Sequence, residues 1–299
     1  MIDLSGQFPP IPTSFEGGRV SPAHLAENIA RWNDEPLEGY VVLGSNGEAP
    51  LLDEDEKREV VRAARRAIPA GKRLMIVGTG RESTPHAIRA TKEAFDMGAD
   101  AVLLGVPTYY RRDLTPDVLE KHLRAVADAS PGPVILYSVP QFTAMPLVPS
   151  VVESLSPHPR IVGVKDSGGE IENVRALVAA GRRSGKQFSV MIGSARIWAA
   201  GILAGAVGGV LAVSNVAPRL CAEIAVLSRS DSEVAALAAN ERLMPLASAV
   251  TREHGIGGLK AALDLLGYHG GEPRPPLRSA SSAARLQIAG HLRALGLLA

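Results

Sequence analysis

Short apolar runs alternate with amphipathic segments along residues 8–213 of the chain. Eight such runs occur, and they are apolar on both faces, which is typical of strands in a buried parallel sheet. They span residues 8–11, 39–43, 74–77, 101–106, 134–137, 161–164, 189–192 and 210–213. Eight strands that alternate with helices predict an α/β fold, the closed (β/α)8 TIM barrel, and a doubly wound open sheet is the alternative.

The segments between these runs carry signals that start and end helices. Asp53 and Glu56 have the spacing of a capping box. Two Thr-Pro pairs, at 84–85 and 115–116, each place a capping residue before a proline that suits the first turn. Gly98 follows Met97 at the end of another amphipathic segment, as is common at helix ends. These signals support the alternation of strands and helices.

After residue 218 the pattern changes, because no further strand candidate follows. Residues 223–251 and 258–266 are rich in Ala and Leu and predict helices. Residues 270–276 are dominated by Gly and Pro and predict a surface connection, which leads to a last helix at 282–295. We therefore expect a catalytic barrel at 1–218 and a C-terminal helical extension at 219–299.

Residues 197–213 contain no polar or charged side chain and raise the question of a membrane span. A spanning helix needs about 20 such residues, and this run is shorter and is interrupted by four glycines. It predicts a buried helix, a glycine turn and a buried strand. Residues 1–12 lack a basic region followed by an apolar run, so we expect no signal peptide and a cytoplasmic location.

The charge balance excludes several classes of partner. The chain of 299 residues has 32 basic and 31 acidic side chains, a net charge of +1. Such a balance predicts no nucleic-acid partner and no attraction to an anionic membrane. Cys221 is the single cysteine, so an intrachain disulfide is impossible. The seven histidines are scattered and form no metal-binding motif, so we expect no metal site.

A lysine stands at the end of the sixth apolar run. Lys165 follows residues 161–164 and precedes Asp166 and a Ser-Gly-Gly turn. Burial disfavours the charged form of a lysine, and a free amine can attack a carbonyl carbon to form a Schiff base. The alternative is a lysine whose ammonium group reaches the surface from a strand end.

Other strand ends carry further candidates, because active sites of such barrels lie at the carboxyl ends of the strands. The loop Gly44-Ser45-Asn46-Gly47-Glu48 offers backbone amides and two polar side chains to a carboxylate or phosphate, or is an ordinary glycine turn. Two of only five tyrosines, Tyr109 and Tyr110, follow the fourth run. Tyr137 ends the fifth run and could relay protons, or could cap the core with its hydroxyl.

Taken together, these motifs resemble one known superfamily. Gly44-Ser-Asn-Gly-Glu48, the Tyr109-Tyr110 pair, Tyr137-Ser-Val-Pro140, Gly163-Val-Lys-Asp-Ser-Gly-Gly169 and Gly255-Ile-Gly-Gly-Leu-Lys260 occur in order over nearly the whole chain. They are similar to the pyruvate-dependent class I aldolases, the superfamily of dihydrodipicolinate synthase and N-acetylneuraminate lyase. Within it, the chain most resembles the 4-hydroxy-2-oxoglutarate aldolases.

The resemblance implies a role for each matching residue. Lys165 would form the Schiff base, and Tyr137 would shuttle protons to and from the substrate's hydroxyl. Ser45 and Asn46 would hold the carboxylate of the 2-keto acid, and by position Ser167 and Gly193 would help to bind substrate. Tyr110 would reach into the active site of a neighbouring subunit, which implies a homo-oligomer, most simply a tetramer. Chemistry of this kind requires no metal and no added cofactor.

One departure from the synthase pattern bears on the substrate. The synthases carry an arginine two residues after the Tyr-x-Val-Pro proline, and this chain has Phe142 there. We therefore expect a lyase that splits 4-hydroxy-2-oxoglutarate, or a similar 2-keto acid, into pyruvate and an aldehyde such as glyoxylate. Arg111 and Arg112, which follow the Tyr109-Tyr110 pair, are the candidate cations for a second carboxylate. The alternatives are dihydrodipicolinate synthase, an aldolase or dehydratase of 2-keto-3-deoxy sugar acids and, more distantly, a catalytically silent keto-acid sensor.

Overall fold

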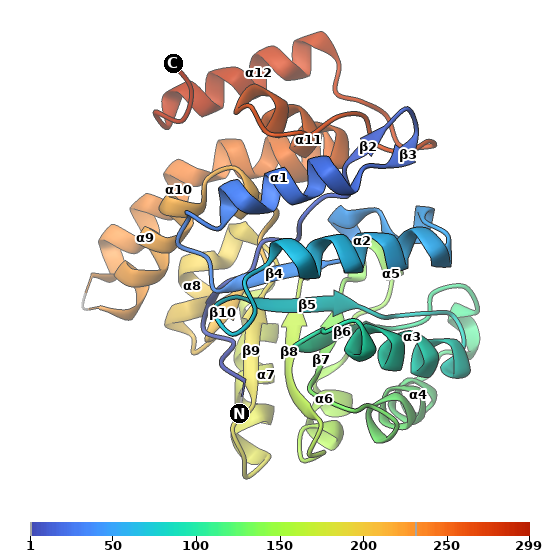
Figure 1. The fold of residues 1–299 in the computed structure, drawn as a ribbon. Coiled ribbons are helices and arrows are strands. Elements are labelled where there is room, and N and C mark those ends of the chain that lie inside the picture. The colour runs from blue at the N-terminus through green and yellow to red at the C-terminus, as the bar shows by residue number, and fades with distance from the viewer. Residues whose placement is uncertain (1, 231) are drawn as a thin grey trace.

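Eight parallel strands form a barrel surrounded by helices in the computed structural model, which describes residues 2–230 and 232–299 (Figure 1). Neighbouring strands follow the order β1-β10-β9-β8-β7-β6-β5-β4. The strands are β1 (Gly6–Gln7), β4 (Gly39–Val42), β5 (Leu74–Gly78), β6 (Ala101–Gly105), β7 (Val134–Ser138), β8 (Ile161–Asp166), β9 (Ser189–Ile192) and β10 (Gly208–Gly209). This arrangement confirms the predicted TIM barrel and excludes the open sheet.

The first strand is shorter than predicted and begins earlier in the sequence, at Gly6. The expected strand at 8–11 is wrong, because Pro9 and Pro10 have no backbone N–H to donate to a neighbour. The segment still closes the barrel: Pro10 pairs with Val41 of β4 in an isolated parallel bridge. The Val41 N–H donates to Pro9 O at 3.0 Å, and the Ile11 N–H donates to Val41 O at 3.0 Å.

The last strand also differs from the prediction. The expected strand at 210–213 is wrong, because β10 consists of Gly208 and Gly209, and Ala212–Asn215 forms a 3₁₀ turn, η5. A Cβ on Gly208 would lie 2.4 Å from Leu4 O, and one on Gly209 would lie 2.4 Å from the Trp198 ring. The chain therefore needs glycines where the eighth strand passes between its neighbours, and the apolar residues follow in the turn.

Helices cover the outside of the barrel, as the alternating pattern predicts. They are α1 (Pro22–Trp32), α2 (Glu54–Ala67), α3 (Thr84–Asp96), α4 (Pro116–Asp128), α6 (Pro149–Leu155), α7 (Ile171–Arg183), α8 (Trp198–Leu203) and α9 (Pro218–Arg229), with a short α5 (Pro140–Thr143) after β7. Each longer helix buries one apolar face in the core between helices and sheet. A second core fills the barrel interior with side chains that include Phe8, Ile76, Leu103, Ile135 and Met191.

Most of the predicted helix starts are confirmed. Asp53 and Glu56 form the capping box of α2: the Glu56 N–H donates to Asp53 Oδ1 at 2.8 Å, and the Asp53 N–H donates to Glu56 Oε2 at 3.0 Å. Thr115 precedes α4 as its N-cap residue. The expected cap of α3 is off by one position, because Ser83 rather than Thr84 accepts the His86 N–H. Gly98 follows the end of α3 with φ = +88°, a conformation that favours glycine.

The C-terminal part is helical, as predicted, although its first helix is divided. The helical stretch predicted at 223–251 contains two helices: α9 ends at Arg229 and α10 spans Glu233–Ser248, followed by a π-helical turn at Ala249–Glu253 (η6). The helices expected at 258–266 and 282–295 are confirmed as α11 (Gly255–Leu265) and α12 (Ser282–Ala294). The boundary between residues 218 and 219 stays a prediction.

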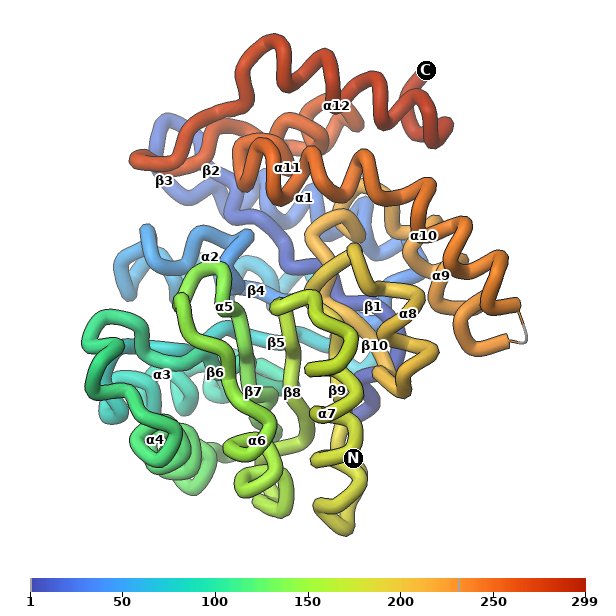
Figure 2. The backbone as a smooth tube through the Cα atoms, turned by 180° about the vertical axis from the view of Figure 1, so that it is seen from behind, coloured from blue at the N-terminus to red at the C-terminus, as the bar shows by residue number. Residues whose placement is uncertain are grey.

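Helix α12 lies at the outer side of the C-terminal part, and α11 lies between α12 and α1 (Figures 1 and 2). Next to them is an antiparallel hairpin of β2 (Phe15–Glu16) and β3 (Arg19–Val20), which the alternating pattern did not predict. In residues 2–230 and 232–299, no helix has the length and apolar composition that crossing a membrane requires. The apolar stretch at 197–213 instead contributes α8, β10 and part of η5.

Candidate active site

Lys165 lies inside the barrel, close to its carboxyl end. Strand β8 continues to Asp166, two residues beyond the predicted end, so Lys165 is part of the strand and only 5% exposed. It pairs with Tyr137 of β7 and Met191 of β9, two residues of the interior core. Its Nζ is 4.3 Å from the centroid of the Tyr137 ring. The lysine side chain is therefore buried beside a phenol and does not extend to the surface.

The Tyr137 hydroxyl connects this lysine to the loop after β4. Tyr137 is 8% exposed, and its OH is 3.3 Å from Ser45 Oγ, within hydrogen-bond distance. Either oxygen can be the donor of this hydrogen bond. The structure thus brings together three of the predicted site residues: Ser45, Tyr137 and Lys165.

The loop that carries Ser45 and Asn46 is a 3₁₀ turn, η1 (Ser45–Gly47), and both side chains remain partly exposed and open to a ligand. The N-terminal segment contacts this turn: Thr13 Oγ1 donates to Gly47 O at 2.6 Å. A Cβ on Gly47 would lie 3.2 Å from Ile11 O, so the glycine permits a close approach of the two segments. The loop is consequently fixed in place, and it is not an ordinary solvent-exposed turn.

Ser167 and Gly193 also meet, at the carboxyl ends of β8 and β9. The Gly193 N–H donates to Asp166 O at 2.6 Å, and the Ser167 N–H donates to Ser138 O at 2.9 Å. A Cβ on Gly193 would lie only 2.0 Å from Ser167 Oγ, so any other residue at 193 would displace the serine side chain. Both residues belong to the same edge of the barrel as Lys165.

Asp166 is a buried carboxyl group that the sequence interpretation did not single out. It follows Lys165 and, since side chains alternate along a strand, it points to the opposite side, toward α7. Burial raises the pKa of the Asp166 carboxyl, and Ser138, Asn173 and the backbone of Gly168 and Gly169 offset that rise only in part. Its position directly after Lys165, before the Ser-Gly-Gly turn, is the sequence signal that could have identified it.

Tyr110 lies at the surface of the single chain. It is 70% exposed, and its ring packs edge to face against Tyr109, with 5.0 Å between the ring centroids. The buried Tyr137–Lys165 pair and the exposed Tyr110 are therefore in different environments. Exposure is what a residue that crosses to a partner subunit needs, and this role stays a prediction.

Three arginines lie on loops at the carboxyl edge of the barrel. Arg111 and Arg112 are exposed on η3 (Arg111–Asp113), where Arg111 Nε donates to Thr108 O at 3.2 Å. Arg196, which the sequence interpretation missed, follows β9 and contacts the turn after Lys165. Its guanidinium group donates to Gly169 O and forms an ion pair with Glu170 at 2.8 Å. Phe142, at the position of the synthase arginine, is 64% exposed on α5.

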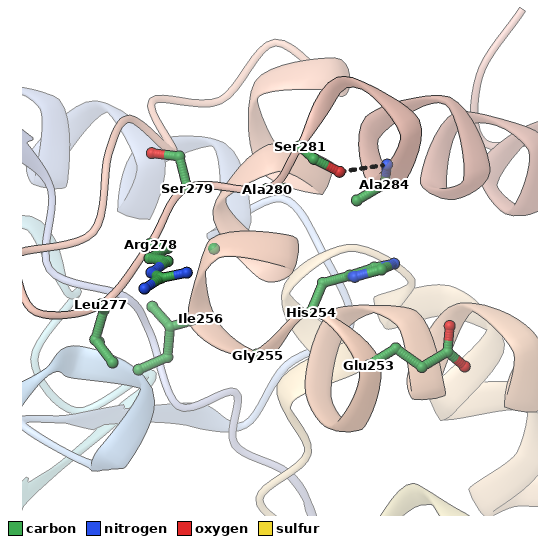
Figure 3. A pocket seen from close by; sticks show the side chains of 11 residues that line it. Glu253, His254, Gly255, Ile256, Leu277, Arg278, Ser279, Ala280, Ser281 and Ala284 are labelled. Carbon is green, nitrogen blue, oxygen red and sulfur yellow. Dashed lines mark hydrogen bonds between the residues drawn. The ribbon is translucent and has the colours of Figure 1, made fainter.

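A cavity of about 270 Å³ lies in the C-terminal helical part, away from Lys165 and Tyr137 (Figure 3). It is lined by the start of α11, by the segment 277–281 and by Ala284 of α12. Across residues 2–230 and 232–299, no three His, Cys, Asp or Glu side chains are grouped so that they could hold a metal ion. The absence of a metal from the chemistry stays a prediction.

Comparison with known proteins assigns the chain to a family. The model of the dihydrodipicolinate synthetase family matches residues 3–295. The chain belongs to this family. It is 35% identical to a 4-hydroxy-tetrahydrodipicolinate synthase of Acidiphilium cryptum over 289 residues, which are 95% of each chain. It is 33% identical to a synthase of the same name from Cereibacter sphaeroides, over 99% of this chain and 100% of the relative.

Solved structures of the family share the fold. A chloride-inhibited dihydrodipicolinate synthase from Acinetobacter baumannii, complexed with pyruvate, is 28% identical and has a TM-score of 0.91, with 99% of each chain covered. Family membership makes this chain an enzyme of the pyruvate-dependent class I aldolase group, a carbon–carbon lyase. The predicted superfamily is confirmed, whereas the curated relatives carry the synthase name and not that of the 4-hydroxy-2-oxoglutarate aldolases.

Proposed function

We propose that the protein cleaves 4-hydroxy-2-oxoglutarate, or a similar 2-keto acid, to pyruvate and an aldehyde such as glyoxylate through a Schiff base on Lys165. The observation that carries this proposal is the buried contact of Lys165 with Tyr137, 4.3 Å from Nζ to the ring, beside a Ser45 hydroxyl 3.3 Å from the phenol. A keto-acid sensor would need neither an amine nor a proton relay at this place.

The reaction begins at the amine. The free amine of Lys165 attacks the ketone carbon of the substrate, and loss of water leaves an imine that is protonated on nitrogen. This group withdraws electrons from the neighbouring bonds. It thereby allows the bond between C3 and C4 of the substrate to break, and the electron pair moves into an enamine on the lysine.

Tyr137 acts on the hydroxyl group at C4 of the substrate. The hydroxyl group on C4 becomes the carbonyl of the aldehyde, so its proton must be removed, and the phenol oxygen of Tyr137 is the acceptor. Ser45 can pass that proton onward, since its Oγ is 3.3 Å from the phenol OH. Protonation of the enamine and hydrolysis of the imine then release pyruvate and regenerate the amine.

The groups that we expect to bind the substrate's 1-carboxylate belong to the loop after β4, which contacts Tyr137. Ser45 and Asn46 offer side-chain donors and the η1 turn offers backbone amides. Ser167 and Gly193, which lie together at the ends of β8 and β9, border the same edge. We assign these four residues to substrate binding.

The competing proposal is dihydrodipicolinate synthase, and the names of the curated relatives favour it. Against it stands Phe142, which offers no charge to the carboxylate of the synthase's second substrate. A hydrogen bond to a charged group contributes about 1.5–3 kcal/mol, so losing one costs roughly 10- to 150-fold in rate. We therefore expect a higher kcat/KM for cleavage of 4-hydroxy-2-oxoglutarate than for condensation of pyruvate with aspartate semialdehyde.

Measuring both reactions on one preparation decides between these substrates. Faster condensation would overturn the substrate assignment and leave the lysine mechanism in place. A panel of 2-keto-3-deoxy sugar acids, with pyruvate as the common product, tests the remaining branch of the superfamily.

Arg196 is the cation that we assign to the second carboxylate of the substrate, because its guanidinium group donates to Gly169 O in the turn after Lys165. The matched variant Arg112→Met is expected to change KM less than Arg196→Met.

We also expect assembly into a homo-oligomer in the cytoplasm, most simply a tetramer built from dimers. Tyr109 and Tyr110 are 78% and 70% exposed, and two adjacent aromatic rings at the surface are typical of residues that a partner covers. Sedimentation of the wild type should show dimers or tetramers at assay concentration, and Tyr110→Ala should lower activity together with the oligomer fraction. A fully active wild-type monomer would contradict this expectation.

A further inference from the structure

An ion pair between Glu48 and Lys260 is fully buried, and the proposed chemistry does not use it. Lys260 Nζ lies 2.8 Å from Glu48 Oε1, and both side chains have 0% exposure. Glu48 directly follows the η1 turn with Ser45 and Asn46, whereas Lys260 lies on α11 in the C-terminal part of the chain. The pair therefore joins the C-terminal helices to the loop of the active site.

Further bonds surround the pair on the side of the C-terminal segment. Lys260 Nζ donates to Glu272 O at 3.0 Å, and the Arg274 N–H donates to Glu48 Oε2 at 2.7 Å. Both cations also contact the Phe15 ring, whose centroid is 4.4 Å from Lys260 Nζ and 4.6 Å from the Arg274 guanidinium carbon. Both carboxylate oxygens of Glu48 thus face groups from the segment 260–274.

Such a pair is poorly explained as a device for stability alone. Removing two charges from water costs several kcal/mol per ion, and an apolar pair of similar volume is often equally stable or more stable. In some proteins a buried polar or charged group instead specifies one geometry. Here the buried pair holds Glu48, the residue that directly follows the Ser45-Asn46 loop.

The loop's shape depends on Glu48 directly. Glu48 has φ = +56°, a left-handed conformation that is unfavourable for a residue with a side chain, and its backbone N–H donates to Ser45 O at 3.1 Å. The same residue thus closes the η1 turn with its backbone and is held by α11 through its carboxylate. Ser45, at the other end of this turn, reaches the Tyr137 hydroxyl.

The anchor for the pair is rigid. A Cβ on Gly257 would lie 2.2 Å from Arg278 O, and one on Gly270 would lie 2.0 Å from Lys260 O. Backbone segments therefore pack directly against α11 at two places, its first turn and Lys260. Figure 3 shows this first turn beside the segment that carries Leu277 and Arg278. Helix α11 consequently cannot shift without moving the connection at 270–281.

We propose that Glu48 and Lys260 are positioning residues, which hold the Ser45-Asn46 loop in the geometry that binds the carboxylate of the 2-keto acid. This inference rests on the proposed function, since it assigns that carboxylate to the loop. It gives the C-terminal helices a part in catalysis: they fix the binding loop from outside the barrel. Neither residue touches the substrate.

The test is borohydride trapping of pyruvate on Lys165, measured as a function of pyruvate concentration. In Glu48→Gln and Lys260→Met, the half-saturating pyruvate concentration should rise by at least about tenfold, which corresponds to about 1.4 kcal/mol of lost binding. The final yield of adduct at saturation should stay near that of the wild type, because Lys165 and Tyr137 are unchanged. Circular dichroism and thermal unfolding establish that each variant is folded at the assay temperature.

A matched control separates positioning from stability. Lys186 is a partly buried lysine that also binds backbone carbonyls, those of His158 and Ile161, at the opposite end of β8. Lys186→Met should lower the melting temperature without changing the half-saturating concentration. The double variant Glu48→Gln/Lys260→Met removes the unpaired buried charge. It should recover stability relative to Lys260→Met, while its half-saturating concentration should remain high.

The outcomes distinguish the two proposals. If the wild type forms no adduct on Lys165, the proposed function fails, and this inference fails with it. If the wild type forms the adduct and Glu48→Gln has an unchanged half-saturating concentration, only the positioning role is overturned. Glu48→Gln is nearly isosteric, so it keeps the test available should Lys260→Met not fold.

Discussion

The Lys165→Arg protein is expected to fold and to lose its aldolase activity. A guanidinium group stays protonated and cannot form an imine, so the covalent route closes while the positive charge remains. Removing the nucleophile of an enzyme commonly costs on the order of 10⁵-fold or more in turnover. The measurement is pyruvate release from 4-hydroxy-2-oxoglutarate at saturating substrate, with thermal unfolding as the check on folding.

A second variant of Lys165 tests whether the loss of activity comes from the shape of the arginine side chain and not from loss of the amine. Lys165→Met removes the amine and keeps an unbranched side chain against Tyr137 and Met191. Both variants should be equally inactive, although only one retains a charge. Turnover above about a hundredth of the wild-type value in either variant would mean that another group is the nucleophile.

The Tyr137→Phe protein is expected to lose roughly 10²- to 10⁴-fold in kcat, the usual contribution of a positioned general acid or base. The ring belongs to the interior core and should remain in place, because only the hydroxyl that faces Ser45 is deleted. Loss of that hydrogen bond should lower the free energy of unfolding by only about 1 kcal/mol. The change therefore acts on the chemistry far more than on the fold.

Two controls assign the Tyr137 effect to proton transfer. Pyruvate should still be trapped on Lys165 by borohydride, because the amine is intact. The Ser45→Ala protein should lose less kcat than Tyr137→Phe, since Ser45 relays the proton and is not its first acceptor. A Tyr137→Phe protein with wild-type kcat would contradict the assignment.

The central strands and the barrel were predictable from sequence because their apolar runs have no competing signal. β5, β6, β7 and β9 lie where the pattern placed them, to within one residue at each end. The two strands that close the barrel were misplaced, since Pro9 and Pro10 cannot donate to a sheet and β10 consists of Gly208 and Gly209. The hydrophobic pattern shows neither the missing N–H groups of the prolines nor the close backbone packing that requires the glycines.

The candidate site was predictable in part. Lys165, Tyr137 and Ser45 were identified because each follows or ends a strand, and the barrel brings strand ends together. The Glu48–Lys260 pair was not predicted, because charged residues are usually exposed and nothing local reveals a partner on a distant helix. Arg196 was missed for a similar reason: only the packing of Gly169 against the loop after β9 reveals its place.

Reduction of the wild-type protein with borohydride in the presence of pyruvate, followed by peptide mass mapping, tests the central claim most directly. The account predicts one pyruvate-derived adduct per chain, on the peptide that contains Lys165, and none when pyruvate is omitted. Lys165 and Lys260 are both buried, but only Lys165 faces the Tyr137 ring inside the barrel. An adduct on Lys260 or on any other lysine, or no adduct at saturating pyruvate, would contradict it.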